Sequence, residues 1–358
     1  MAATSLRGRL FGDVELSSPT TVRIGGAGVA GLTAAINLAR AGEDAEVLEM
    51  KAAVGSSAGT HTEGVRNYLG RDGLEDLARF GVRAKAFSVA QRVFRRSPNF
   101  TSVIRGPSYY LIARGPGRGT LERQLLEQAL DAGARVVFRT KVLPDAVDIL
   151  ATGAARARVN IVAAGYRFTR EGSNLRDDEI HSLFDNAIAP HGYLCVLPGP
   201  VWHSVYTCAW SSMPYNALLR MVDRALAYDW VRDLMGTAEV VGRIFGKAHY
   251  ASDPYEAARS PGPLRVGEAA GIQDAAGGFG IRYAIASGAL AARSFLDHSD
   301  YAASLRAEFQ DDFEIANRGR AWLARATNDD YDAFLQKLGP EGRVADYAEW
   351  RKDRFAYP

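Results

Sequence analysis

Residues 22–49 contain the pattern that most constrains what this chain can fold into. A short apolar strand over 22–24 leads into Gly26-x-Gly28-x-x-Gly31, and an alanine-rich helical segment follows. In a strand-turn-helix unit, the first glycine allows the tight turn, the second lets the backbone approach a pyrophosphate, and the third lets helix and strand pack closely. The pattern predicts a dinucleotide-binding β-α-β unit rather than an ordinary glycine-rich turn.

A second predicted strand ends at Glu49, whose carboxylate can accept hydrogen bonds from ribose hydroxyls. The helix after the glycines offers free N–H groups and the positive end of its dipole to phosphates. The alternative for Glu49 is a solvated strand end without a ligand. This first unit does not distinguish FAD from NAD.

Composition narrows the class of protein. The 358 residues are 47% hydrophobic with a net charge of +2, which is typical of a two-domain globular protein without a general attraction to nucleic acid. No apolar run is long enough for a membrane span, and residues 1–21 lack a signal-peptide core, so no export signal is expected. Two cysteines and six dispersed histidines predict a reducing, cytoplasmic location and no metal site.

Residues 264–293 decide between the two cofactors. A predicted strand leads into Gly267-Glu268, and a glycine-rich turn then opens a helix of small residues. An acidic residue beside glycines can bind a polyol, such as the ribityl chain of a flavin. Free N–H groups at Gly280 and Ile281 can face the N1–C2=O edge of a flavin and stabilise negative charge on the reduced ring. FAD is therefore the expected cofactor.

In these blocks the chain resembles the FAD-dependent superfamily typified by para-hydroxybenzoate hydroxylase and, within it, the geranylgeranyl reductases. The resemblance extends from about residue 22 to 296, and Glu268 stands where the family has an aspartate. It implies an α/β fold with a discontinuous Rossmann-like FAD-binding domain, a β-sheet substrate domain and a helical C-terminal segment. The residues that it assigns to FAD binding are Gly26, Gly28, Gly31, Glu49, Lys51, Arg114, Val142, Gly267, Glu268, Gly280 and Ile281.

Patterns along the rest of the chain give the expected elements and domain bounds. The predicted elements are helices over 72–80 and 119–133, strands over 135–138 and 159–162, and a hairpin over 190–210. The expected domains are FAD-binding at 19–80, 112–170 and 262–300, substrate-binding at 81–111 and 171–261, and a helical segment at 301–358 with a break at Gly339-Pro340. The helical segment packs on the body or makes at most peripheral contact with a membrane.

The hairpin carries an altered form of a reductase signature, Pro-x-x-Tyr-x-Trp-x-Phe-Pro. Pro190, Tyr193 and Pro198 are in place, but Cys195 replaces the tryptophan and Leu197 replaces the phenylalanine. Both changes shrink side chains that are expected to face flavin or substrate. We therefore expect a lipophilic small-molecule substrate, prenyl-like or other. An ordinary hairpin with turn-shaping prolines is the alternative.

A second departure concerns the electron donor. Many hydroxylases of this superfamily carry an Asp-Gly motif that is tied to flavin and nicotinamide handling, and the matching place is interpreted as Ala163-Ala164-Gly165. Because the carboxylate is absent, the donor is either NAD(P)H or a separate reductase protein. Aromatic residues that line a pocket or fill the core of the substrate domain are Trp202, Tyr206, Trp210, Tyr215 and Trp230.

These features together predict reduction of a carbon–carbon double bond, with hydride from flavin N5 and a proton from Cys195 or Tyr193. His61 is a further catalytic candidate near the flavin, and Cys195 and Cys208 are either a redox pair or small apolar side chains. The first rival is a monooxygenase that acts through a flavin C4a-hydroperoxide. The second is a non-catalytic FAD-binding protein. A halogenase is disfavoured because the sequence contains no Trp-x-Trp-x-Ile-Pro.

Overall fold

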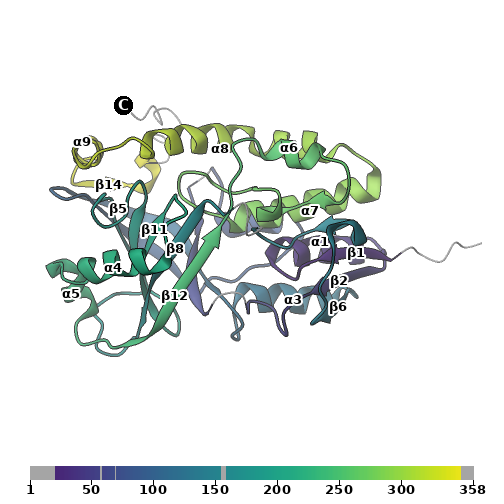
Figure 1. Cartoon of the computed structure of the whole chain (residues 1–358), viewed down its shortest axis with the longest axis horizontal. Helices are drawn as coiled ribbons and strands as arrows, with labels where there is room; N and C mark the ends of the chain where they lie inside the picture. Colours follow the sequence, from purple (N-terminus) through teal and green to yellow (C-terminus); the bar gives the residue numbers. More distant parts are fainter. Residues whose placement is uncertain (1–20, 57–58, 69, 155–158, 348–358) are drawn as a thin grey trace, which may run out of the picture.

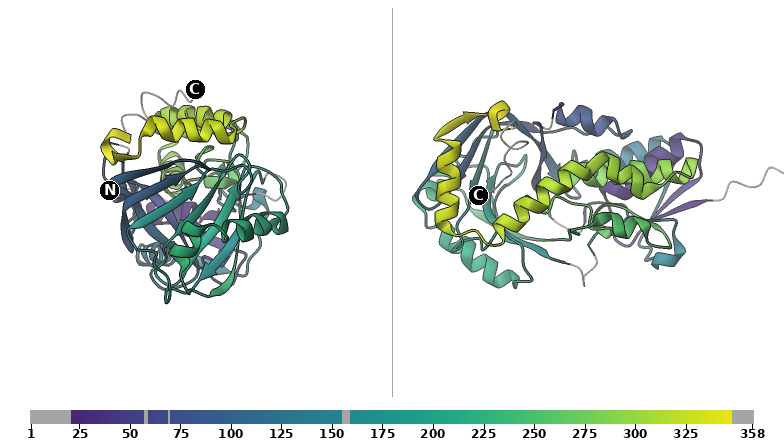
Figure 2. Two further views of the ribbon diagram at one scale, coloured as in Figure 1. Left: turned by 90° about the vertical axis from the view of Figure 1, so that its left-hand side faces the viewer. Right: turned by 90° about the horizontal axis from the view of Figure 1, so that it is seen from above.

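The computed structural model describes residues 21–56, 59–68, 70–154 and 159–347. Two sheets lie at opposite ends of the molecule in Figure 1, and the long helix α8 (Tyr301–Leu323) runs over both of them. The views in Figure 2 show the same helix crossing from one part to the other. The space between the two sheets is where a site built from both parts can form.

The smaller sheet is parallel at every pairing and has the strand order β13-β7-β1-β2-β6. Its strands are β1 (Val22–Gly25), β2 (Ala45–Glu49), β6 (Arg135–Phe138), β7 (Ile149–Leu150) and β13 (Leu264–Arg265). Helices α1 (Val29–Arg40), α3 (Leu121–Asp131) and α7 (Ile281–Asp297) pack together beside it. Since helices cover parallel sheets, the central strands are apolar and buried.

The larger sheet has nine strands, in the order β12-β8-β11-β10-β9-β4-β5-β14, with β3 paired to β5. Its strands are β3 (His61–Arg66), β4 (Ser88–Arg96), β5 (Thr101–Arg114), β8 (Ile161–Phe168), β9 (Glu179–Leu183), β10 (Tyr193–Leu197), β11 (His203–Ala209), β12 (Val240–Ala248) and β14 (Glu341–Arg343). Most pairings are antiparallel, and β4–β9 and β5–β14 are parallel. An extended antiparallel sheet of this kind can present one face to a cavity.

The remaining helices pack against the two sheets and against other helices. They are α2 (Gly73–Ala78), α4 (Tyr215–Ala225), α5 (Asp229–Met235), α6 (Pro254–Arg259) and α9 (Asn328–Leu338), with short 3₁₀ turns at Pro144–Ala146 and Gly267–Ala269. Helices α4 and α5 bury Val222 and Val231 against Val205 and Leu194 of the larger sheet. None of the helices in the described part of the chain has both the length and the apolar character that a membrane span requires.

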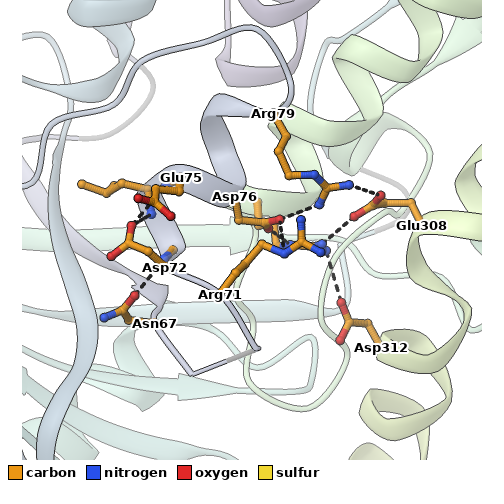
Figure 3. Close-up of polar contacts among 11 residues, drawn as sticks. Asn67, Arg71, Asp72, Glu75, Asp76, Arg79, Glu308 and Asp312 are labelled. Carbon is orange, nitrogen blue, oxygen red and sulfur yellow. Dashed lines mark hydrogen bonds and ion pairs between the residues drawn. The ribbon is translucent and has the colours of Figure 1, made fainter.

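Ion pairs hold α2, α7 and α8 together. Arg282 of α7 reaches Asp76 of α2 at 2.5 Å and Glu308 of α8 at 2.6 Å, and Arg79 joins the same two carboxylates at 2.7 and 3.3 Å. Figure 3 shows Asp76, Arg79, Glu308 and Asp312 converging on one point from these helices. Although burial raises it, the pKa of Asp76 is lowered by Arg282 and Arg79, so the network stays charged. It fixes the helix α7 whose N-terminus faces the site.

The predicted elements are largely confirmed: the β-α-β unit, the helices near 72–80 and 119–133, the strand at 135–138, the hairpin within 190–210 and the break at Gly339-Pro340. Strands β3, β7, β9, β12 and β14 and helices α4, α5 and α6 were not predicted. Residues 348–358 of the predicted helical segment lie outside the described residues. The sheets also cross the predicted domain bounds, because β3 and β8 pair in the larger sheet. The predicted limits of the FAD-binding and substrate-binding domains therefore remain predictions.

The stretch Ala163-Ala164-Gly165 does not end a strand, and that part of the sequence interpretation is wrong. It lies in the middle of β8, which continues to Phe168 between β11 and β12. On the side of β1 away from β2, the neighbouring strand is β7, and Ala151-Thr152-Gly153 follow it. Neither stretch has a carboxylate, so the argument about the electron donor is unchanged.

Candidate cofactor and substrate site

The glycine-rich turn after β1 is built as the spacing predicts. Gly26 has a φ of +107°, in the left-handed region that favours glycine, and a Cβ there would meet the carbonyl oxygen of Ala151 at 2.5 Å. A Cβ on Gly31 would meet the carbonyl oxygen of Gly26 at 2.0 Å. At Gly28, by contrast, an added Cβ would meet no atom within 4 Å. The protein's own packing therefore requires the first and third glycines, whereas the second faces open space.

Two helices begin beside this turn without a capping side chain. The N-cap of α1 is Gly28 and that of α7 is Gly280; neither has a side-chain hydrogen bond, and neither first turn contains an acidic residue. The first N–H groups of a helix have no partner within the helix, and the helix dipole adds positive potential there. Val29 and Ile281, the first residues of the two helices, line the same cleft. Both helix ends can therefore bind one anionic or carbonyl-rich ligand.

Glu49 and Lys51 lie at the same turn. The carboxylate oxygens of Glu49 accept hydrogen bonds from the N–H groups of Ala27 at 2.8 Å and Lys51 at 2.7 Å. These bonds orient the carboxylate and leave lone pairs on each oxygen for ligand hydroxyls. Lys51 thus supplies its backbone, while its side chain is exposed. Val142 packs over the end of β1, with its Cγ2 3.0 Å from a Cβ built on Gly25.

A cleft of about 250 Å³ extends from the two helix N-termini to the larger sheet. One wall comes from the starts of α1 and α7 and from the turn at Gly267–Ala269, where the N–H of Gly267 donates to Ser287 Oγ at 2.9 Å. The facing wall comes from β3, β8 and β12. The predicted site residues that line this cleft are His61, Arg114, Tyr193, Glu268, Gly280 and Ile281.

Arg114 lies in the cleft as predicted, but its guanidinium is already paired. It binds the carboxylate of Glu63 and, at 2.8 Å, that of Glu122. His61 places Nε2 3.1 Å from Glu63 and Nδ1 2.8 Å from the carbonyl oxygen of Gly59. Although burial raises it, Arg114 and His61 lower the pKa of Glu63 to about 2. Burial lowers the pKa of His61, but Glu63 more than offsets this, so the imidazole pKa lies above its ordinary 6.5.

Glu268 has the opposite electrostatic environment. Burial, and then repulsion from Glu63, raises its pKa to about 7, against the weaker opposing effect of Arg114. At neutral pH this carboxyl is partly protonated, so it can donate as well as accept hydrogen bonds. Such a group is suited to a ligand hydroxyl in a cleft.

A second cavity of about 190 Å³ lies on the inner face of the larger sheet, and we call it the apolar cavity. Its apolar and aromatic lining includes Val93, Tyr109, Leu111, Ile180, Phe184, Leu197, Phe279, Trp322, Leu323 and Phe334. Residues that line both the cleft and the apolar cavity are Glu63, Tyr193, Tyr206, Gly278 and Gly280. The two spaces are therefore neighbours, and a ligand in one can reach a ligand in the other.

The hairpin β10–β11 places the predicted catalytic residues at this shared wall. Tyr193 donates its hydroxyl hydrogen to the carbonyl oxygen of Gly277 at 2.6 Å. Cys195 lines the apolar cavity, and Cys208 lines the cleft. Burial raises the pKa of each thiol to about 12, so both are protonated and weakly nucleophilic near neutral pH.

The strand register disfavours a disulfide between the two cysteines. Cys195 pairs with Tyr206, and Cys208 pairs with Tyr193. The cysteines are therefore diagonal neighbours, at about 7–8 Å, and a disulfide needs a closer approach. Both are free in the structure.

Only part of the predicted aromatic group faces the site. Tyr206 lines both spaces, whereas Trp210 donates its indole N–H to Ala275 at 2.6 Å. Trp230 lies over Arg96 at 4.3 Å, and Tyr215 packs on Phe245. The linings of the two spaces do not include Trp202, Trp210, Tyr215 or Trp230 among the residues described.

Sequence reasoning missed four charged residues of the site: Glu63, Arg66, Arg95 and Asp274. Arg66 and Asp274 form an ion pair with side chains only 9% and 1% exposed, and Arg66 also lies 4.2 Å above the ring of Phe279. Three of the four lie on β3 and β4. The alternation of polar and less polar side chains along β3 could have indicated a strand, but the segment is short and Gly64 interrupts the alternation.

Solved structures with the same fold include several flavin-dependent proteins. A geranylgeranyl bacteriochlorophyll reductase-like protein from Thermoplasma acidophilum matches with a TM-score of 0.70 at 19% identity, over 93% of this chain and 96% of that one. A flavoprotein/dehydrogenase from Cytophaga hutchinsonii gives 0.59 at 14% identity, over 90% and 93%. The flavin-dependent halogenase CmlS gives 0.59 at 16% identity, over 92% and 72%. The sequence matches no protein-family model and no curated protein. The chain thus has the α/β fold of these flavoproteins.

Proposed function

We propose that this chain binds FAD and catalyses a flavin-dependent redox reaction on an apolar small molecule. The observation that carries the proposal is a cleft between two uncapped helix N-termini that shares a wall with an apolar cavity. Ligand sites of this kind combine an apolar lining with a few placed polar groups. The similarity in fold to a reductase-like protein and to a flavoprotein/dehydrogenase supports the choice of a flavin.

The residues of the cleft fit FAD in a specific way. The open backbone at Gly28 and the N-terminus of α1 would bind the pyrophosphate, and Glu49 would bind the adenosine ribose. Glu268 would bind the ribityl chain, while the N–H groups at the start of α7 would face the ring. When bound, FAD supplies hydride or electron transfer. The ion pair of Arg114 with Glu63 would hold the wall beside it.

The favoured reaction is reduction of a carbon–carbon double bond, with Cys195 as the proton donor. Its thiol keeps its proton because burial raises its pKa to about 12, and it is hydrogen-bonded to Tyr206. Tyr193 is less suited, since its hydroxyl hydrogen is already donated to Gly277. We expect Cys195→Ala to slow reoxidation of the reduced protein by substrate about 100-fold or more. Ser204→Ala is the control and should react normally, because Ser204 lies on the neighbouring strand β11, lines neither space and has a hydroxyl without a hydrogen-bond partner among the described residues.

FAD binding can be tested with a matched pair of glycine variants. Gly28 and Gly342 both have open space around an added Cβ and neither has a positive φ, so valine fits the protein at both. We expect Gly28→Val to fold but to purify without flavin absorbance and to gain none on incubation with FAD. Gly342→Val, on β14, should retain FAD as the wild type does. Normal FAD content in Gly28→Val would refute the assignment of this turn.

The requirement for oxygen distinguishes the rival monooxygenase reaction from the proposed reductase reaction. The wild type is reduced with NADH, NADPH or dithionite and mixed with geranylgeraniol or linoleate, once under nitrogen and once in air. A reductase gives a product heavier by two hydrogens under nitrogen. A monooxygenase gives a product heavier by one oxygen atom, and only in air. Reduction by dithionite but by neither nicotinamide would favour a separate electron-donor protein, and FAD binding without any product would favour the non-catalytic alternative.

A further inference from the structure

Arg95 differs from the other charged residues that line the apolar cavity. Glu63 is paired with Arg114, and Arg66 is paired with Asp274. Arg95 is only 9% exposed, and among the described residues no carboxylate lies within ion-pairing distance of it. Among the described residues that line the cavity, Arg95 is therefore a buried positive charge that no carboxylate neutralises.

The ring of Tyr347 partly compensates this charge. The guanidinium carbon of Arg95 lies 4.2 Å from the ring centroid, and the guanidinium is also hydrogen-bonded to the tyrosine side chain. A cation–π contact is weaker than the penalty for burying an ion without a counter-ion. A ligand anion that occupies the cavity would offset this cost, and the apolar walls would bind the rest of the ligand.

The strand register places Arg95 at the end of a row of side chains across the sheet. Arg95 of β4 lies beside Ser182 of β9, which lies beside Cys195 of β10, which lies beside Tyr206 of β11. All four residues line the apolar cavity. Neighbouring strands are about 4.8 Å apart, so Arg95 lies about 10 Å from Cys195 and about 14 Å from Tyr206 at the cleft. Arginine binds carboxylates through paired N–H groups. The hydroxyl of Ser182 donates to the carbonyl oxygen of Phe94 over a long distance of 3.3 Å, and it can rotate toward a ligand beside Arg95.

We propose that the apolar cavity binds a lipophilic carboxylate, with its head group on Arg95 and Ser182 and its chain directed toward Tyr206 and the cleft. That this ligand is the substrate rests on the proposed function. A single guanidinium without a carboxylate partner among the described residues matches a single negative charge, whereas a diphosphate would bring a larger charge than this wall can neutralise. The row also separates the two ends of the ligand, because the head group is bound at one end of it and the cleft lies at the other.

The test compares ligands with the same chain and different head groups. Calorimetry on the full-length protein, incubated with FAD, measures binding of decanoate, decanol and decyl phosphate at pH 8. We expect decanoate to bind about tenfold or more tightly than decanol, since hydrogen bonds to charged groups are the strong ones. Arg95→Gln should remove this preference. Arg96→Gln is the matched control: Arg96 is the next residue on the strand, lies over Trp230 at 4.3 Å and does not line the cavity.

Each outcome supports or overturns the inference. Equal binding of decanoate and decanol to the wild type, or a preference that survives in Arg95→Gln, overturns it. Tighter binding of decyl phosphate than of decanoate overturns the choice of a carboxylate. If Arg95→Gln does not fold, Ser182→Ala replaces it and should reduce the preference. Flavin absorbance in the same samples separates the two claims: FAD without the head-group preference refutes only this inference, and the preference without FAD refutes only the proposed function.

Discussion

The carboxyl of Glu268 should make the protein less stable as the pH rises through neutrality. Burial and the nearby Glu63 raise its pKa from the ordinary 4.5 to about 7 in the folded chain, whereas the unfolded chain has the ordinary value. Between these two pH values the folded state binds more protons than the unfolded state. By linkage, the free energy of unfolding therefore falls across this window as pH rises. Replacing Glu268 with glutamine removes the ionisation and keeps the shape.

The size of the effect follows from the two pKa values. One pKa unit corresponds to about 1.4 kcal/mol, so ionising Glu268 costs the folded state about 3 kcal/mol. Glu268→Gln should match the wild type near pH 4.5 and exceed its stability by about this amount at pH 8. For a large domain, about 1 kcal/mol changes the Tm by roughly 2 °C, which predicts a difference of about 6 °C at pH 8.

Thermal unfolding of the flavin-free protein, followed by circular dichroism at several pH values, measures this directly. Glu171→Gln is the control, because Glu171 is exposed in the loop after β8, and its effect should be small at every pH. A Glu268→Gln variant whose Tm difference from the wild type is the same at pH 5 and pH 8 would show that the carboxyl is not desolvated. The electrostatic argument for Glu268 would then be wrong, whatever its role toward FAD.

Other perturbations test the packing of the site. Gly31→Ala should destabilise the protein by about 1–3 kcal/mol in chemical denaturation, because the new Cβ meets backbone 2.0 Å away; an unchanged midpoint would contradict the turn geometry. Asp274→Ala leaves Arg66 buried and unpaired and should cost about 3–5 kcal/mol, while replacing both partners with leucine should recover most of it. Cys195 and Cys208 should react with iodoacetamide at pH 8 only after unfolding, since burial raises both pKa values to about 12, and rapid labelling of the folded protein, measured by mass spectrometry, would refute this.

The glycine-rich turn of the candidate site was predictable because it is local in sequence. Gly26, Gly28 and Gly31 lie within one stretch of six residues. Their spacing is enough to predict which positions pack against backbone and which faces open space. Glu268 directly follows Gly267 in sequence. Glu49 reaches the first glycine turn because β2 pairs in parallel with β1 within the same β-α-β unit. Short-range geometry of this kind depends on few distant contacts, so a motif is enough to find it.

The lining of the apolar cavity was not predictable in the same way because it depends on strand register. Arg95 and Ser182 are far apart in sequence, and only the parallel pairing of β4 with β9 makes them neighbours. The hypothesis of a cysteine redox pair illustrates the same limit. The hairpin was predicted, but a shift of two positions in register separates facing cysteines from the diagonal ones observed. β14 likewise pairs with β5 across more than half of the chain.

The altered hairpin signature has a physical meaning once the register is known. Cys195 occupies the middle of the row that leads from Arg95 to Tyr206, and Leu197, two residues further along β10, lines the same cavity. A tryptophan at 195 would fill the space between the carboxylate end of the row and the cleft. The small thiol leaves that space open. The departure from the reductase signature thus leaves an unobstructed route between the buried Arg95 and the proposed flavin. The substitution and the arginine, which has no carboxylate partner among the described residues, thus describe one feature, a continuous passage for the proposed lipophilic acid.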